Sequence, residues 1–125
     1  MDIFKVGIMF NIGIAVYDAE KTARLYVDTL GLKIEHDETS ADQGVRAIML
    51  VPENDSSSTA IELLEPVVED SSISKFLEKR GEGMHHICYL VEDISKGIEH
   101  LKSQGIEMID HEPREGINKT TKKNF

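Results

Sequence analysis

The fold is decided by NIGIAVYD, residues 11–18, because the chain repeats this pattern 75 positions later as HICYLVED, residues 86–93. Both segments are apolar and end in Val-x-Asp, and Lys21 matches Lys96 at the same offset. A strand, an acidic cap, a helix and a terminating glycine in the same order twice indicate an internal repeat. The sequence therefore predicts two related modules that share one core.

A helix is expected after each repeated strand. Asp18 and Asp93 are good N-caps, because a carboxylate accepts hydrogen bonds from the unpaired N–H groups of a first helical turn. Gly31 and Gly105 stand where a helix commonly ends in a left-handed residue. Between these signals the apolar residues recur at helical spacing: Ala19, Ala23, Tyr26 and Leu30 in the first helix, and Ile94, Ile98 and Leu101 in the second.

The remaining segments give module one more predicted strands than module two. Three strands are predicted after Gly31, over residues 32–37, 45–51 and 60–64, with a polar loop at 52–58. We interpret the chain as one domain, 1–125, made of module one (about 6–66), a connecting helix (about 71–80), an incomplete module two (about 84–112) and a tail (113–125). Module two reads β-α-β, with residues 106–109 as its last strand. The following residues are nearly devoid of apolar side chains, and they predict no further pair of strands.

This pattern predicts an α+β fold whose modules form a curved, mixed and incompletely closed sheet around a cleft. The connecting helix is indicated by Ile73, Phe76 and Leu77, which share one helical face.

Charge and composition exclude several classes of binding partner. The net charge is −9 and the pI is about 4.9, so the surface repels phosphate groups, and neither nucleic acid nor an anionic membrane is an expected partner. The longest apolar stretch, residues 6–16, is too short to span a bilayer and is expected to be a buried strand. The single cysteine, Cys88, excludes an internal disulfide and fits a cytoplasmic or organelle-matrix location.

Three residues are candidate metal ligands. Asn11 and His86 head the two equivalent strands, so we expect them to face each other across a pseudo-two-fold axis. Neutral imidazole is a common ligand of divalent transition metals. Glu62 is a carboxylate within the apolar strand Ile61-Glu62-Leu63-Leu64. The competing interpretations are that strand alternation turns Glu62 to water and that His86 is a hydrogen-bonded core residue. His85 is set aside, because successive strand residues point to opposite faces.

At these residues the chain resembles the methylmalonyl-CoA epimerases of the vicinal-oxygen-chelate superfamily, which also holds lactoylglutathione lyase and extradiol dioxygenases. The resemblance covers about residues 8–116 and is most specific in SSISKFLEKRGEGMHHI, residues 71–87. It also includes residues 12–16, 26–32, 43–46, 61–66 and 112–114.

The resemblance implies a glyoxalase-like fold and a metal cleft. Two of the family's four ligand positions fall on Glu62 and His86. A third, a histidine in the family, falls on Asn11, and the fourth lies in a final strand with no counterpart, so the chain is expected to be truncated at its C-terminus. A catalytic glutamate of some members would fall on Ala47.

The activity implied is interconversion of (R)- and (S)-methylmalonyl-CoA, by metal-assisted proton abstraction through an enediolate. The implied cofactor is cobalt or another divalent transition metal, and the implied partner is an acyl-CoA substrate. We also expect a homodimer, because missing strands would leave an unpaired sheet edge.

Two alternatives remain open at this point. One is another glyoxalase-type lyase or isomerase, against which the run from Lys75 to Ile87 argues. The other is a catalytically inactive, truncated fold or binding module, which Asn11, Ala47 and the short tail favour.

Overall fold

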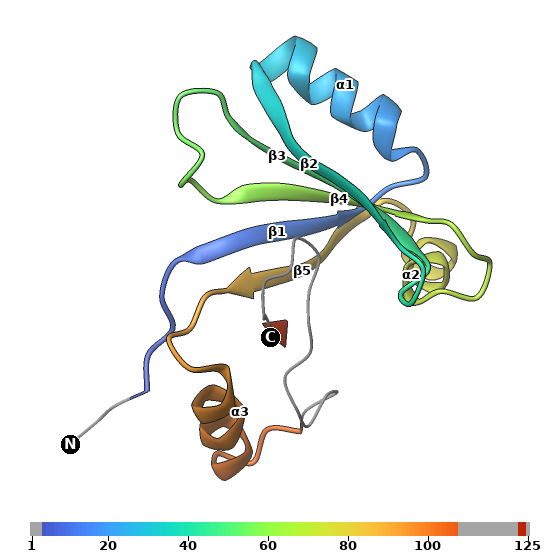
Figure 1. Cartoon of the computed structure of the whole chain (residues 1–125). Coiled ribbons are helices and arrows are strands. Elements are labelled where there is room, and N and C mark those ends of the chain that lie inside the picture. The colour runs from blue at the N-terminus through green and yellow to red at the C-terminus, as the bar shows by residue number, and fades with distance from the viewer. Residues whose placement is uncertain (1–3, 108–122, 125) are drawn as a thin grey trace.

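One mixed sheet forms the centre of the molecule (Figure 1), and its strand order is β2-β3-β4-β1-β5-β6. The computed structural model describes residues 4–107 and 123–124. Strand β1 runs parallel to β4, and every other neighbouring pair is antiparallel. The predicted α+β fold is therefore confirmed. In chain order the elements are β1 (Met9–Ala15), α1 (Ala19–Leu30), β2 (Leu32–Ser40), β3 (Val45–Pro52), β4 (Ala60–Pro66), α2 (Ser72–Arg80), β5 (Gly83–Tyr89), α3 (Ile94–Ser103) and β6 (Lys123–Asn124).

The repeat is visible in how α1 and α3 begin. The Asp18 carboxylate accepts a hydrogen bond from the backbone N–H of Lys21 at 3.0 Å, and Asp93 accepts one from Lys96 at 3.1 Å. Both caps have extended backbone with φ of −138°, the conformation that an N-cap requires. The two modules therefore start their helices with the same local device, as the sequence predicts.

The pairing of β1 with β5 relates the two modules. Ile12 lies opposite Ile87, its own equivalent in the repeat, so the pseudo-two-fold axis passes through this pair. Asn11 pairs with Cys88, and Gly13 pairs with His86. Asn11 and His86 consequently flank the axis diagonally, on the same face of the sheet, and are not directly paired.

Each face of the sheet carries its own helix (Figure 1). On one face, α1 packs against β3 and β4; the buried residues there are Val16, Ala19, Ala23, Ile48, Leu50 and Leu63. The other face, which we call the site face, carries α2; its buried residues near that helix are Ala15, Val45, Ala47, Leu64, Ile73 and Leu77. Strand alternation separates the two sets, since neighbouring residues of β3 and β4 point to opposite faces.

Two predicted strands differ from those observed. The first strand begins at Met9, and Val6 and Ile8 before it are exposed. Within residues 106–109, Ile106 and Glu107 form no regular structure, and 108–109 lie outside the described residues. The Ile106 N–H instead donates to the Leu101 carbonyl, at 3.0 Å, near the end of α3. This N–H group is therefore not available to pair with a neighbouring strand.

The sequence predicts no further pair of strands in the C-terminal tail, and the described part of the tail contains one strand of two residues, β6. Lys123 pairs with Tyr89 and Asn124 with Cys88, so β6 extends the sheet beyond β5. The other tail residues, including the resembling stretch 112–114, lie outside the described residues. No helix in the described part of the chain is long and apolar enough to cross a membrane.

Candidate functional site

The site is built on Gly13, in the middle of β1. Gly13 is paired with Glu62 of β4 on one side and with His86 of β5 on the other. A Cβ atom at this position would lie 2.6 Å from His86 Nδ1 and 2.7 Å from His86 Nε2, which is closer than nonbonded atoms approach. The imidazole therefore occupies the space above a residue without a side chain, and it crosses the central strand toward Glu62.

His86 and Glu62 form a buried pair. His86 Nε2 lies 3.5 Å from Glu62 Oε1, and the side chains are only 11% and 2% exposed. The distance fits an ion pair, and among the described residues Nε2 has no hydrogen-bond partner. A buried carboxylate is costly unless something compensates its charge. Because Glu62 is buried, the alternative in which strand alternation turns it to water is wrong.

Asn11 is the second buried polar residue on the site face. It is fully buried, and within the described part of the chain neither its amide oxygen nor its amide nitrogen has a hydrogen-bond partner. Each unsatisfied buried group costs about 1–3 kcal/mol. Asn11 precedes Gly13 by two positions, so it lies on the same face of β1. The two amide atoms of Asn11 are satisfied if an ordered water molecule or a ligand supplies their hydrogen bonds.

His85 lies beside His86, contrary to the prediction from strand alternation. Gly13 pairs with His86 but Ile14 pairs with Met84, so His85 is the extra residue of a β-bulge. The bulge brings the two Nδ1 atoms to 3.0 Å, with the rings at 84° to each other. The sequence carries no signal for this bulge, so the regular alternation assumed for His85 and His86 does not hold at this point of β5.

Phe76 and Arg80 of α2 pack next to His85. Its imidazole meets the Phe76 ring edge-on, with centroids 5.0 Å apart, and Arg80 lies over the Phe76 ring at 5.8 Å. Burial, together with the nearby His86, lowers the pKa of His85, while Glu62 acts in the opposite direction. The neutral imidazole is therefore favoured, and it can exchange a hydrogen bond with His86.

His36 is a residue of this face that the sequence analysis missed. It pairs with Met49, and Met49 pairs with Glu62. The register thus places one row of residues across five strands: His36, Met49, Glu62, Gly13 and His86. We call this set the site row.

A second bulge explains why His36 was missed. Ile34 pairs with Leu50 but His36 pairs with Met49, so Glu35 is an extra residue and the faces of β2 exchange there. Ile34 accordingly lies on the α1 face and His36 on the site face. His36 Nε2 lies 2.7 Å from Glu38 Oε2, which makes a second imidazole–carboxylate pair.

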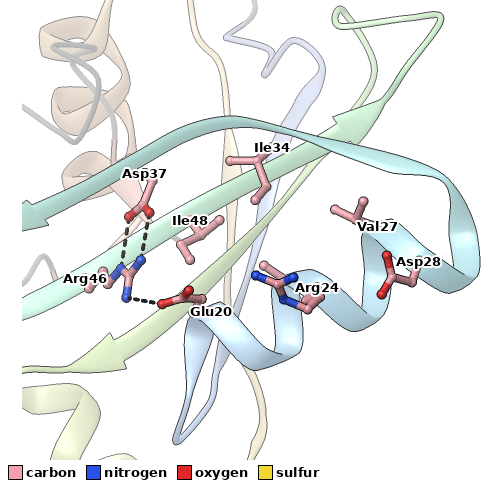
Figure 2. A pocket seen from close by; sticks show the side chains of 9 residues that line it. Glu20, Arg24, Val27, Asp28, Ile34, Asp37, Arg46 and Ile48 are labelled. Atoms are coloured by element: carbon pink, nitrogen blue, oxygen red, sulfur yellow. Dashed lines mark hydrogen bonds and ion pairs between the residues drawn. The ribbon is translucent and has the colours of Figure 1, made fainter.

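A pocket of 320 Å³ lies on the opposite face, between α1 and the strands β2 and β3 (Figure 2). Val27, Ile34 and Ile48 form its apolar wall, and Arg46 donates to both carboxylate oxygens of Asp37, at 3.1 and 2.8 Å. None of the predicted site residues lines this pocket, and Arg46 is already paired. The candidate chemistry therefore belongs to the site face.

The donors on the site face fit a divalent metal in part. His86 Nε2 is a buried, unsatisfied nitrogen, Glu62 supplies a buried carboxylate, and Asn11 supplies a buried, unsatisfied amide oxygen. In the described residues, no group of three or more His, Cys, Asp and Glu side chains could hold a metal ion. A site with a single carboxylate and an amide as its oxygen donors would bind more weakly than one of several histidines and carboxylates.

Comparison with known proteins identifies relatives of this fold. The model of the Glyoxalase/Bleomycin resistance protein/Dioxygenase superfamily matches residues 10–125. The ethylmalonyl-CoA/methylmalonyl-CoA epimerase of Cereibacter sphaeroides is 40% identical over 115 residues, which cover 90% of this chain and 83% of that protein. The uncharacterized protein YqjC of Bacillus subtilis is 37% identical over 108 residues, covering 86% of this chain and 74% of that protein.

A solved structure agrees with these relatives. A variant of Streptomyces coelicolor methylmalonyl-CoA epimerase in complex with 2-nitronate-propionyl-CoA superimposes with a TM-score of 0.87 at 34% identity. The match covers 94% of this chain and 83% of that one.

Proposed function

The chain belongs to the Glyoxalase/Bleomycin resistance protein/Dioxygenase superfamily, and from this premise we propose that it is an epimerase that interconverts (R)- and (S)-methylmalonyl-CoA. The observation that carries the proposal is the buried pair of His86 and Glu62, which meet across Gly13. It is supported by the names of the relatives, one of them an epimerase solved with an acyl-CoA-like ligand.

We propose that His86 Nε2, Glu62 and Asn11 hold a divalent metal, with cobalt as the first candidate among transition metals. When bound, such an ion acts as a Lewis acid that stabilises negative charge on a thioester oxygen. The chain's own contribution is preorganisation: His86 and Glu62 are fixed by the sheet and shielded from water, so their field acts in a low-dielectric site. Asn11 contributes its amide oxygen beside them.

The test is a coupled assay with racemic methylmalonyl-CoA, with and without added cobalt. We expect turnover that depends on the metal and is lost in His86→Ala. A chain that binds cobalt but leaves the substrate mixture unconverted contradicts the proposed reaction. Conversion of another acyl-CoA or of a glutathione adduct alone would identify a different lyase or isomerase.

A specific observation favours a second candidate function, that of a binding protein with the same fold. Ala47, the position at which the resemblance implies a catalytic glutamate, is fully buried in the packing beneath α2. A methyl group moves no proton, so a chain that relied on this position would bind substrate without converting it. Calorimetry with the acyl-CoA then shows binding while the coupled assay shows no turnover.

We also propose that the protein acts as a homodimer in the cytoplasm or an organelle matrix. Among the described residues, β6 pairs with only the last two residues of β5, which leaves residues 83–87 as a sheet edge beside the exposed Met84. A second copy would cover this edge. Sedimentation at micromolar concentration tests the dimer, and Met84→Lys should dissociate it.

A further inference from the structure

We propose that His36 and Glu38 form the acid–base pair that moves the α-proton of the substrate on one face of the reacting carbon. This inference rests on the proposed epimerase function. It is drawn from the site row. His36 is the titratable residue of that row that is not among the proposed metal ligands.

The register places His36 at working distance from the buried pair. Neighbouring strands lie about 4.8 Å apart, so the Cα atoms of His36 and Glu62 are separated by roughly 10 Å, two strand spacings. An imidazole extends about half of that distance from its Cα atom. Met49 lies between the two residues, and its thioether transfers no proton. The register therefore places Glu62 and His36 on opposite sides of Met49, which is itself buried.

The geometry of the pair suits proton transfer. The Glu38 carboxylate lies 2.7 Å from His36 Nε2, which orients the ring. The second nitrogen, Nδ1, then serves as the proton acceptor. Triad-like arrangements of this kind use the carboxylate to hold the imidazole and the imidazole to move the proton.

Exposure separates the roles of the two imidazole–carboxylate pairs. The side chains of His36 and Glu38 are 29% and 45% exposed, so a substrate can reach them. His86 and Glu62 are nearly buried, which suits groups that stabilise charge. Glu38 is paired in register with Ala47, the position at which the resemblance implies a catalytic glutamate, so a carboxylate lies one strand away from that position.

The step is a balanced proton transfer. His36 Nδ1 takes the α-proton as the C–H bond breaks, and the electron pair of that bond moves onto the thioester carbonyl to give an enolate. A water molecule or a protonated side chain on the opposite face then delivers a proton, which forms the new C–H bond with inverted configuration. His36 returns its proton to solvent.

The experiment compares His36→Gln and Glu38→Gln with Glu35→Gln, a matched change at an exposed position of the same strand. Each separate epimer is incubated in D2O, and α-deuterium uptake and epimerisation are followed by NMR. For His36→Gln we expect at least ~100-fold loss of epimerisation, and loss of deuterium uptake from one epimer only. Glu38, as the positioning residue, should lower kcat with KM unchanged. Cobalt affinity and melting temperature should match the control.

The outcomes separate the two proposals. If the wild type neither exchanges nor epimerises, the proposed function fails and the acid–base assignment falls with it. If the wild type is active and His36→Gln retains exchange from both epimers, the assignment alone is overturned. Equal losses in Glu35→Gln, or loss of cobalt binding in His36→Gln, would also overturn it, because they indicate a structural effect.

Discussion

The imidazole of His86 lies directly over Gly13, its register partner on the neighbouring strand, and it contacts Glu62 one strand further on. A glycine in a strand usually weakens the sheet, since it adds no packing and costs backbone entropy. Here its lack of a side chain is what allows residues from two non-adjacent strands to meet. The glycine at position 13 is therefore explained by the contact between His86 and Glu62 and not by a contribution to the stability of the sheet.

Replacing Gly13 with Ala should disrupt the site. A methyl group there overlaps the imidazole, so His86 must rotate away, and we expect a stability loss of about 1–3 kcal/mol. Cobalt affinity should fall at least tenfold, because His86 no longer faces Glu62. Gly83→Ala is the matched control, since a Cβ at Gly83 meets no atom within 4 Å. Thermal unfolding and cobalt calorimetry measure both effects; unchanged cobalt affinity in Gly13→Ala would contradict the metal site.

Replacing Asn11 with His should tighten cobalt binding, because an imidazole then takes the place of a weak amide donor. It is not expected to raise turnover to the same degree. The matched variant Asn11→Leu has a similar size and removes the two unsatisfied polar atoms, so it should be as stable as the wild type or more stable. It should also bind cobalt more weakly. Equal cobalt affinity in all three proteins would show that Asn11 does not take part.

The protonation of His85 should make stability fall in mild acid. Burial first, and then the charge of His86, lowers the pKa of His85 below its ordinary value of 6.5. Below that pH the unfolded chain takes up a proton that the folded chain resists, so the free energy of unfolding decreases as pH falls toward the lowered pKa. Urea unfolding between pH 5 and 8, taken as about 1.5 units either side of the unfolded pKa, should show this slope. His85→Gln should reduce it; an identical slope in the variant would show that other groups cause it.

Asp37 and Arg46 should contribute to stability without affecting activity, because they lie on the α1 face (Figure 2). The hydrogen bond from Arg46 lowers the pKa of Asp37 below 3.8. The contribution is therefore present above that pH and is lost as pH falls through the lowered pKa. Since the pair is solvent-exposed, Asp37→Asn should cost no more than about 1 kcal/mol at neutral pH. Chemical unfolding and the epimerase assay test this; a loss of turnover would place the α1 face in the mechanism.

The sequence predicts the parts of the fold that depend on local chemistry. The caps at Asp18 and Asp93 and the glycine after α1 have short-range causes, and each is observed where expected. The repeat is recognised by comparing segments 75 residues apart, and its two strands pair with each other in the sheet. The sequence does not decide whether Glu62 is buried, because a carboxylate in an apolar strand can lie on either face of the sheet. Its contact with His86 depends on register, which the repeat indicated only in part.

Two bulges account for the site residues that the sequence did not predict. One extra residue, Glu35 in β2 and His85 in β5, reverses the alternation of the strand at that point. His36 thereby moves to the site face, and His85 moves against His86. A bulge is defined by the pairing of two strands, in which two residues of one strand lie opposite one residue of the other, so the pattern of a single strand does not predict it.

The two ends of the His86–Glu62 contact come from different repeats. A ligand that bridges them binds only the chain in which the repeats have docked, and by mass action it stabilises that docked state. At one hundred times its dissociation constant, such a ligand adds about 2.7 kcal/mol. The pairing of β1 with β5 is therefore linked thermodynamically to occupancy of the site, so that hydrogen exchange of the β5 amides should slow as the ligand concentration rises.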